Sequence, residues 1–533
     1  MRIILYGLPC AGKTTLLSEA KNLLSVINGG EELKKFSGSI ETKRKQFLQE
    51  LGRIDDYFID GHYEFITDDK KEVAFTSENE IFDVFMYLYQ SPSVLYNRMS
   101  TSCKNRKYLP TSIDDIKNWQ LDEINNLREI CHESDKDFYI IDDWESNFKN
   151  FIPFCKDVID GFSNVHFAKE IVSKIDFSEK DLSLFDGDKT LISYDTSRTF
   201  LNFTTDIFDN NFYTGYQFWL QDKIIRKDFN KSAVENTIFS NGLNQDLLHR
   251  AKNAIILSSG LSEIWNDIIG QKYGIKVFAG KKVSAETKYF VAKFLKKKYT
   301  VTAYGDSKND LFMLREADTG YIVIYNHLSR SLLRSEIAGL KIINFNQNFT
   351  ILSDDESISE SEKGEILNLV KITKSDSGIN GNRLAKAHFE LGNKISRYFS
   401  SIPENDTTVI SFERSGHFFA DGIYMNFNGR FESYNSKIQD FSQLKTKNVV
   451  LVDGVINNGK SMLAAIDKIE QQSRDIKITI VANVINKDAV ELFNVYDLFV
   501  VRVSDNKFTG SNVHTQVGNI GPDTADRLFN QLN

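Results

Sequence analysis

The sequence predicts an α/β protein of three serial domains, each with a mainly parallel sheet. Three apolar stretches end abruptly in polar loops that open helix-like segments: RIILYGLPCAGKTTLL from Arg2, DLSLFDGDKTLI from Asp181 and VVLVDGVINNGKSM from Val449. In such folds, ligands bind where parallel strands end and helices begin. A chain of 533 residues has room for roughly two to four domains. We expect domains at 1–155, 156–350 and 364–533, with the acidic segment 352–365 as the best linker candidate.

Composition and charge narrow the class of protein. The chain has 41% hydrophobic residues, 6 prolines and 30 glycines, which is typical of a folded soluble protein. Its formal net charge of -8 argues against a dedicated nucleic-acid binder, which usually presents a basic face. No apolar stretch approaches the roughly 20 residues of a membrane helix, so we expect no membrane partner. The four cysteines lack metal or disulfide spacing, which suits the cytoplasm.

The first loop meets a phosphate-binding spacing. Gly7, Gly12, Lys13 and Thr14 match G-x-x-x-x-G-K-T, between a strand at 3–6 and a helix that begins near Lys13. Loop N–H groups and the helix N-terminus can cradle phosphates, the lysine can reach the outer phosphates, and the threonine hydroxyl can bind magnesium. Thr15, next in line, is a further phosphate-binding candidate.

A second carboxylate follows the next apolar run. Asp60 ends the strand-like YFID, where it could bind magnesium or take a proton from a substrate hydroxyl. A solvated turn is the alternative. Residues 1–150 resemble the small nucleoside and nucleotide kinases of the adenylate kinase-like group. The resemblance implies a P-loop NTPase fold, ATP as phosphoryl donor, and lid arginines over the transferring group, for which Arg98 and Arg106 are candidates. It does not name the acceptor.

The middle of the chain carries four ordered motifs. Each motif places polar side chains at the end of an expected strand or in an expected helix. In chain order, the candidate residues are Asp186, Asp188, Ser258, Ser259, Lys288, Asp306, Asn309 and Asp310. Once a strand has ended, two aspartates spaced by two can both turn toward one pocket. Alone, the D-G-D segment could instead be a solvated turn or a calcium-binding loop.

Together, these motifs resemble haloacid dehalogenase-like (HAD-like) phosphatases of the phosphoserine phosphatase branch. The resemblance implies a Rossmannoid fold with Asp186 as nucleophile and Asp188 as acid and base. Lys288 and either Ser258 or Ser259 would hold phosphate oxygens. A helical cap at about 192–250 would select the substrate. The remaining assignments are Asn309 to the substrate and Asp186, Asp188, Asp306 and Asp310 to magnesium, with Asp188 contributing its backbone carbonyl.

The third loop, at 449–462, admits two interpretations: a structural strand-to-helix turn, or a seat for a 5-phosphate at a helix N-terminus. The segment 364–533 decides between them because ERSGHFFADG (413–422) and the tail GPDTADRLF resemble uracil phosphoribosyltransferase. That resemblance implies a type I phosphoribosyltransferase fold, phosphoribosyl pyrophosphate (PRPP) as co-substrate, and a homo-oligomer through this domain. Asp453 would face the ribose hydroxyls, and Arg414 would contact pyrophosphate.

The other residues implied by this resemblance fall into two groups. The 5-phosphate would be wrapped by Asn457, Asn458, Gly459, Lys460 and Ser461, and the base pocket would be walled by Asp523, Asp526 and Arg527. Most phosphoribosyltransferases have two acidic residues and a threonine-glycine pair here, whereas this chain has Asp453-Gly454 and Asn457-Asn458-Gly459. Uracil enzymes also lack the second acid and have proline in its place. These departures leave the base unassigned and keep open a domain that binds without turnover.

Two classes of function follow. One is a multifunctional enzyme that combines ATP-dependent phosphorylation, magnesium-dependent phosphomonoester hydrolysis and phosphoribosyl transfer to a nucleobase, with nucleobase, nucleoside or nucleotide substrates. The other is nucleic-acid end processing, because a kinase fused to a HAD-like phosphatase also resembles polynucleotide kinase-phosphatases. The acidic charge and the expected cap disfavour the second class. A nucleotide or PRPP sensor with a degenerate last domain is a third possibility.

Overall fold

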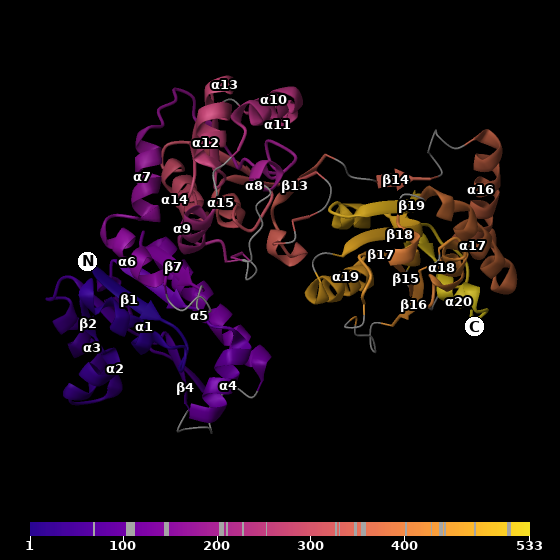
Figure 1. Ribbon diagram of the computed structural model, residues 1–533. Coiled ribbons are helices and arrows are strands. Elements are labelled where there is room, and N and C mark those ends of the chain that lie inside the picture. The colour runs from indigo at the N-terminus through magenta and orange to yellow at the C-terminus, as the bar shows by residue number, and fades with distance from the viewer. Residues whose placement is uncertain are drawn as a thin grey trace. The chain divides into compact units, whose positions relative to one another are not determined.

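The computed structural model describes residues 1–67, 70–102, 112–142, 149–201, 207–208, 212–225, 229–251, 253–325, 328–329, 331–345, 349–352, 359–399, 402–427, 429–435, 441, 444–473, 476–508 and 513–532. Two compact units make up the chain, Met1–Ile322 and Val323–Asn533 (Figure 1). Three parallel sheets confirm a multi-domain α/β protein. The bounds of three separate domains stay a prediction.

The first sheet has five parallel strands in the order β2-β3-β1-β6-β7. Its strands are short apolar runs such as RIILY, which suit a sheet that helices cover on both faces. The strands are β1 (Arg2–Tyr6), β2 (Ser25–Ile27), β3 (Tyr57–Asp60), β6 (Val84–Leu88) and β7 (Asp137–Ile141), with an antiparallel hairpin of β4 (Glu64–Thr67) and β5 (Lys70–Val73). The helices are α1 (Lys13–Glu19), α2 (Gly29–Glu32), α3 (Ile40–Leu51), α4 (Pro92–Ser102), α5 (Ile113–Glu133) and α6 (Phe151–Ile159).

The second sheet has six strands in the order β10-β9-β8-β11-β12-β13. They are β8 (Asp181–Phe185), β9 (Ala254–Ser258), β10 (Lys276–Ala279), β11 (Thr300–Gly305), β12 (Thr319–Ile324) and β13 (Lys341–Asn344). The associated helices are α7 (Asn164–Ser173), α8 (Thr196–Leu201), α9 (Gly215–Ile224), α10 (Lys231–Asn241), α11 (Gln245–Leu248), α12 (Ser262–Ile264), α13 (Gln271–Tyr273), α14 (Ala285–Leu295) and α15 (Leu311–Glu316). Because β8 and β11 are parallel neighbours, the loops that follow them meet at one edge of the sheet.

Helix α9 lies in the segment predicted to form a cap, yet it packs into the core of the first sheet. Tyr216, Trp219 and Leu220 belong to the same buried cluster as Tyr139 of β7 and Phe154 of α6. The Phe154 ring lies 4.8 Å from the Tyr216 ring and 5.3 Å from the Trp219 ring, centroid to centroid. The aromatic residues at 216 and 219 therefore serve the first sheet rather than an independent cap.

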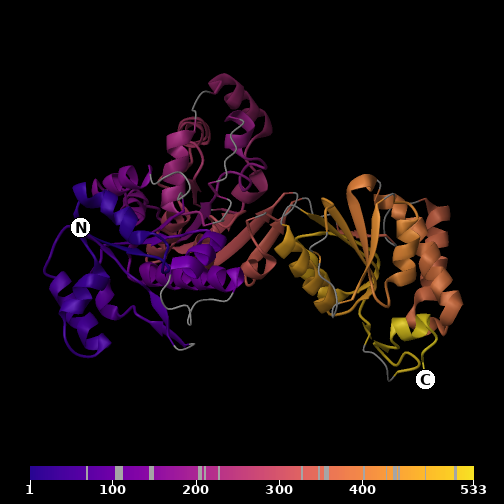
Figure 2. The same cartoon turned by 60° about the horizontal axis from the view of Figure 1, so that its bottom comes forward.

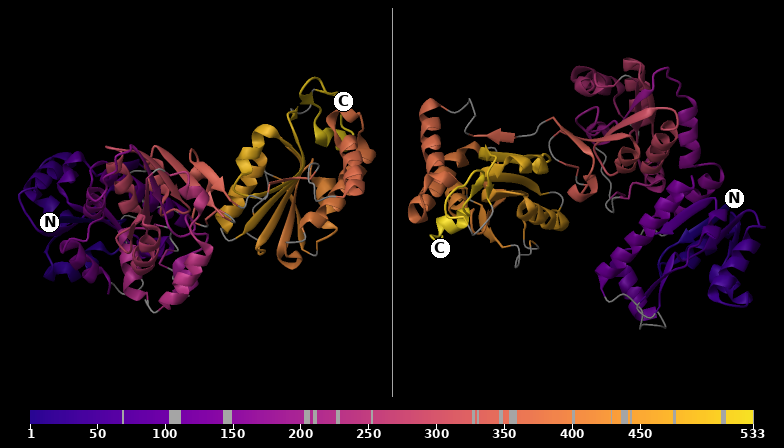
Figure 3. Two further views of the ribbon diagram at one scale, coloured as in Figure 1. Left: turned by 90° about the horizontal axis from the view of Figure 1, so that it is seen from above. Right: turned by 180° about the vertical axis from the view of Figure 1, so that it is seen from behind.

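The third sheet, in the second unit, is parallel and has the order β14-β19-β18-β17-β15-β16. Its strands are β14 (Phe349–Ile351), β15 (Thr407–Phe412), β16 (Arg430–Tyr434), β17 (Asn448–Ile456), β18 (Lys477–Asn486) and β19 (Asp497–Ser504), with a separate pair of β20 (Lys507–Phe508) and β21 (Ile520–Gly521). The helices are α16 (Glu360–Thr373), α17 (Gly381–Ile395), α18 (His417–Tyr424), α19 (Lys460–Gln472) and α20 (Thr524–Leu528). Helix α19 covers one face and α16 and α17 lie on the other (Figure 3). Helix α20, near the C-terminus, lies beside α17 (Figure 2).

Three smaller expectations can be compared with the structure. The segment 352–365 is in part helical, because α16 begins at Glu360, while residues 353–358 lie outside the described part of the chain. Cys10, Cys131 and Cys155 are free thiols. Among the described residues, no helix combines the length and the apolar character that crossing a membrane requires.

The packing of α9 makes a stability prediction. Trp219 is 1% exposed, so Trp219→Ala should lower the free energy of unfolding by roughly 3–5 kcal/mol, the range for a buried large aromatic residue replaced by alanine. Urea unfolding followed by circular dichroism measures this loss. Ile224→Ala is the matched control, because Ile224 lies on the same helix and is 50% exposed. An equal loss in both variants would contradict the packing of α9 into this core.

Candidate functional site

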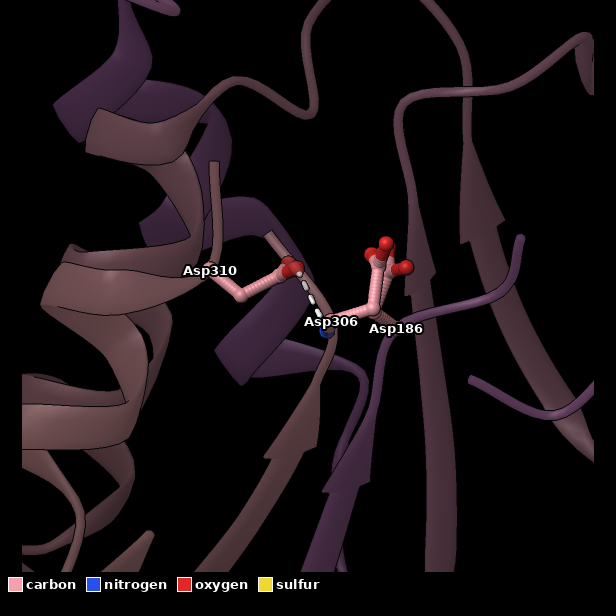
Figure 4. Close-up of side chains that lie close together, drawn as sticks. All are labelled: Asp186, Asp306 and Asp310. Atoms are coloured by element: carbon pink, nitrogen blue, oxygen red, sulfur yellow. Dashed lines mark hydrogen bonds between the residues drawn. The ribbon is translucent and has the colours of Figure 1, made fainter. Parts of the chain in front are cut away.

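Three buried aspartates converge at the edge where β8 and β11 end. Asp186 follows β8, Asp306 follows β11, and Asp310 precedes α15. One carboxylate oxygen from each residue lies within 4.8 Å of the other two (Figure 4). The Asp310 carboxylate also accepts hydrogen bonds from the backbone N–H groups of Asp306 and Ser307, both at 3.2 Å. These bonds fix the loop after β11 around the acidic cluster.

Lys288 provides the cation that holds the cluster together. Its Nζ lies 2.5 Å from Oδ1 of Asp186 and 2.7 Å from Oδ1 of Asp310. Burial opposes a charged lysine, but both carboxylates raise the Lys288 pKa. Burial raises the pKa of Asp186 to about 7, with Asp310 adding to the rise and Lys288 opposing it. Burial, followed by Asp310 and Asp186, also raises the pKa of Asp306.

The composition of this cluster fits a hard divalent cation. Three buried carboxyl groups face one buried ammonium group, and the raised pKa values of Asp186 and Asp306 reflect the cost of gathering negative charge here. Carboxylate oxygen is the ligand that magnesium prefers. Asp186, Asp306 and Asp310 could therefore hold magnesium.

Asp188 and the two candidate serines lie around this cluster in different roles. The Asp188 carboxylate accepts hydrogen bonds from the N–H and the hydroxyl of Thr196, at 3.2 and 3.0 Å, so its side chain does not join the acidic cluster. Burial, followed by Asp195 and Asp186, raises the pKa of Asp188. The assignment of the Asp188 backbone carbonyl to magnesium stays a prediction.

The serine-glycine loop after β9 distinguishes the two serines. Ser258 is buried, and its hydroxyl accepts a hydrogen bond from the N–H of Gly260. Ser259 donates to the carbonyl of Val283 and accepts a 2.8 Å hydrogen bond from Nδ2 of Asn309. Ser259 thus connects this loop to the residue that precedes Asp310.

A cavity of about 290 Å³ opens beside Ser259. Its walls come from α7, α8, α9 and the loops after β9 and β10, and include Phe167, Ser197, Phe218, Asp222, Ser259, Lys281 and Lys282. The size is that of a small-ligand pocket. Ser197 follows Thr196, the partner of Asp188, whereas the three clustered aspartates and Lys288 are not among the lining residues.

The first loop keeps its lysine inside the protein. Nζ of Lys13 donates to the carbonyls of Gly7 and Leu8, at 2.5 and 3.1 Å. Gly12, with φ of 101°, precedes α1 in the left-handed region that glycine favours. Thr14 donates a 3.2 Å hydrogen bond to Asp60, so the two predicted magnesium groups lie together.

The other predicted residues of this loop lie further out. Thr15 is exposed, and its carbonyl accepts a hydrogen bond from Ser18. Arg98 reaches back from α4 to the carbonyls of Cys10 and Ala11, at 3.4 and 3.5 Å. Arg106 lies outside the described residues.

A buried glutamate near Lys13 escaped sequence reasoning. Glu123 of α5 is 0% exposed and accepts hydrogen bonds from the Tyr87 hydroxyl and the Glu64 backbone N–H, at 2.9 and 3.2 Å. Burial raises its pKa to about 7, while Tyr87 and Lys13 oppose the rise. Burial lowers the pKa of Lys13 to about 8, and Glu123 and Asp60 oppose that decrease. The only sequence signal was a charged residue on the apolar face of a long amphipathic helix.

The third site is in the second unit, where β15 and β17 end. The Ser415 hydroxyl donates to Oδ1 of Asp453, which also accepts a 3.3 Å hydrogen bond from the Val455 N–H. A Cβ on Gly454 would lie 2.2 Å from the carbonyl oxygen of Ser415, so this close approach of two loops requires glycine at 454. The departure from an acidic pair therefore has a steric reason.

A cavity of about 260 Å³ lies beside these loops. Its lining includes the predicted residues Arg414, Asn457 and Asp523, together with Ser415. Arg414 donates to Asp526 and Gln531 at 3.1 and 2.6 Å, and Asp523 caps α20 by accepting from the Asp526 N–H. The geometry therefore groups these predicted residues around one cavity.

The remaining predicted residues divide between loop and core. Asn458 accepts a hydrogen bond from the Lys460 N–H, Gly459 has φ of 72°, and Lys460 and Ser461 are exposed at the start of α19. Arg527 is 1% exposed and donates to the carbonyls of Thr373, Lys374 and Ile379. Its guanidinium therefore ties α20 to the segment before α17 instead of lining an open pocket.

Comparison with known proteins yields no family for the chain. No family model matches it, and no curated protein matches it. A solved structure from Aquifex aeolicus is 18% identical, covering 32% of this chain and 96% of that chain with a TM-score of 0.26. An adenine phosphoribosyltransferase from Leishmania donovani is 15% identical (26% and 70% covered, TM-score 0.19), and a HAD family hydrolase from Salmonella enterica subsp. enterica serovar Typhi is 18% identical (31% and 67% covered, TM-score 0.20). At these TM-scores, the likenesses carry no argument about this chain.

Asp453 makes the second prediction. Burial raises its pKa to about 6, against the opposing hydrogen bonds of Ser415, Val455 and Gly454. The folded protein then binds a proton that the unfolded chain releases near pH 4, so the carboxylate lowers stability as the pH rises from about 4 through 6. Asp453→Asn should raise the free energy of unfolding at pH 8 by roughly 1–3 kcal/mol and change it little near pH 4.

Urea unfolding of the ligand-free protein at both pH values measures this difference. Asp467→Asn is the matched control, because Asp467 is an exposed carboxylate on α19. Equal destabilisation of Asp453→Asn at both pH values would show that the carboxylate is needed for packing and is not a strained functional group.

Proposed function

We propose that the protein is a multifunctional enzyme of nucleotide metabolism whose middle site is a magnesium-dependent phosphomonoesterase. The observation that carries the proposal is the convergence of Asp186, Asp306, Asp310 and Lys288, four motif residues from distant parts of the sequence, at one buried edge of a parallel sheet. The four-motif resemblance to HAD-like phosphatases gives this geometry its chemical interpretation.

The residues around the cluster support a two-step displacement. An Asp186 carboxylate oxygen attacks phosphorus, and the bond from phosphorus to the leaving oxygen breaks. Asp188, whose pKa burial raises, gives its proton to that oxygen. Asp188 then takes a proton from water as the water attacks the Asp186 phosphoryl group, which releases inorganic phosphate and restores the Asp186 carboxylate.

Lys288 is the main group of the protein that stabilises negative charge on the phosphate during this reaction. Its Nζ already lies between two carboxylates, so it can stabilise phosphate oxygens as negative charge moves toward the leaving group. Magnesium, held by Asp186, Asp306 and Asp310, would supply charge neutralisation that lets an anionic substrate approach. The cavity beside Ser259 would accept the leaving group, between the rings of Phe167 and Phe218 and the ammonium groups of Lys281 and Lys282.

The other two sites complete the proposal. The last would bind PRPP and a nucleobase, with Asp453 toward the ribose, the loop 457–461 around the 5-phosphate and Arg414 toward pyrophosphate. For that role, Arg414 would exchange Asp526 and Gln531 for the ligand. The first site would bind ATP, with Lys13 exchanging two loop carbonyls for phosphate oxygens and Thr14 and Asp60 holding magnesium.

Product analysis tests the proposal. We expect magnesium-dependent release of phosphate from nucleoside monophosphates or 4-nitrophenyl phosphate, and a loss of at least about 1,000-fold in Asp186→Asn because the nucleophile is removed. Asp181→Asn is the matched control, because Asp181 is exposed at the opposite end of the same strand. Mass spectrometry after incubation with ATP, PRPP and free bases would identify any nucleotide that accumulates in the Asp186 variant.

Two results would contradict the proposal. If wild-type protein releases no phosphate from any monoester in the presence of magnesium, the middle site is not a phosphomonoesterase. If phosphate from labelled ATP appears on oligonucleotide ends and not on small molecules, nucleic-acid end processing replaces nucleotide metabolism. Stabilisation by PRPP without pyrophosphate release would instead indicate a sensor in the last domain.

A further inference from the structure

A buried triad of ionisable residues joins the first sheet's long helix to the helix that carries Lys288. Glu286, in the first turn of α14, is 1% exposed. Its carboxylate accepts from Nε of Arg128 at 2.9 Å and lies 2.5 Å from Nε2 of His132, and both of these residues belong to α5. The side chains of Arg128 and His132 are 7% and 10% exposed.

The same two residues of α5 also contact the helix that follows Asp310. The Arg128 guanidinium carbon lies 4.8 Å from the centre of the Phe312 ring, and the His132 ring lies 5.3 Å from it. Phe312 is in the first turn of α15, two residues after Asp310. His132 also stacks on Tyr289, the residue after Lys288, with ring centres 3.7 Å apart. Arg128 and His132 therefore touch both helices that frame the acidic cluster.

The geometry of α14 connects the contact between Glu286 and α5 to the position of Lys288. Side chains two residues apart on an α-helix project roughly 200° apart. Glu286 therefore points to α5 from one side of α14 while Lys288 points to Asp186 and Asp310 from the other. Any rotation or shift of α14 that loosens Glu286 also moves Nζ of Lys288.

Energetic reasoning favours a positioning role over simple stabilisation. Taking three ionisable groups out of water is costly, and apolar residues of similar volume often stabilise a protein better. Burial raises the pKa of Glu286, but the contacts with Arg128 and then His132 outweigh it and leave the pKa below its ordinary value, which favours the carboxylate form. What such a network provides beyond apolar packing is directional hydrogen bonds that fix one position.

We propose that Arg128 and His132 are positioning residues for the phosphatase centre, contributed by the helix that packs on the first sheet. They hold α14 and α15 so that Lys288 bridges Asp186 and Asp310. This inference rests on the proposed phosphatase function. A displacement of about 1 Å in a catalytic group can cost on the order of 100-fold in rate, so loss of the triad should be seen mainly in kcat.

The experiment compares three variants with an exposed control. Glu286→Gln and Arg128→Met remove the ion pair, and Arg128→Lys keeps the charge but loses the planar guanidinium. With 4-nitrophenyl phosphate and magnesium, well below the melting temperature of each variant, we expect kcat to fall at least roughly 10-fold in the first two and less in Arg128→Lys. KM should stay within about 2-fold. Lys156→Met is the control, because it removes an exposed ion pair with Asp160 on α6.

Each outcome decides the inference. Folded variants, judged by circular dichroism, that retain the wild-type kcat would overturn it, as would losses confined to the melting temperature. If Arg128→Met does not fold, the kcat of Arg128→Lys and Glu286→Gln decides in the same way. Absence of hydrolysis by the wild type would overturn the proposed function, and the inference with it. Wild-type hydrolysis with unaffected variants would overturn the inference alone.

Discussion

The pairing of Lys288 with Asp186 and Asp310 is the interaction on which the middle of the molecule depends. Carboxylates gathered at a buried strand end repel one another and lose their hydration. The fold offsets this cost with one ammonium group at 2.5 and 2.7 Å and with backbone N–H groups that point at Asp310. One ammonium group does not balance three carboxyl groups, so the pKa values of Asp186 and Asp306 stay raised, and a divalent cation would relieve that cost.

The same strand-end principle shapes the other two sheets, with different local solutions. In the first sheet, loop carbonyls hold Lys13 in place, and in the third, Ser415 and a backbone N–H hold Asp453. Glycines let neighbouring loops approach closely enough to share a site. A Cβ on Gly187 would lie 2.4 Å from the Trp265 ring, just as one on Gly454 would meet a carbonyl oxygen. The order of the strands thus determines which loops are neighbours, and glycine at these positions allows a closer approach than a larger residue would.

The sequence predicted the local motifs and, through the family resemblance, the grouping of Asp186, Asp306 and Asp310, but it missed contacts between helices far apart in the chain. The strand, loop and helix around Lys13 and the order of the middle motifs were readable, because spacing along the chain carries them. The segment that contains Tyr216 and Trp219 was predicted to form a cap, and its packing against Phe154 of α6 could not be predicted from the sequence. Arg527 was assigned to a pocket wall, although it binds backbone carbonyls in the core. Glu123 gave only the weak signal of a charge on the apolar face of a helix, and Glu286 was not singled out, because a charge on a helix is usually solvated and only packing shows otherwise.

Helix α9 couples the packing of the first sheet to the cavity beside Ser259. Its residues Tyr216 and Trp219 are fixed in the core of the first sheet, whereas Phe218 and Asp222 line the cavity beside Ser259. A helix buried on one side cannot move its other side independently, because protein interiors are close-packed. The shape of the cavity is therefore set partly by residues in the core of the first sheet that do not line it. A change in the shape of this cavity would then require compensation in that core, which ties the evolution of the cavity to the packing of the neighbouring sheet.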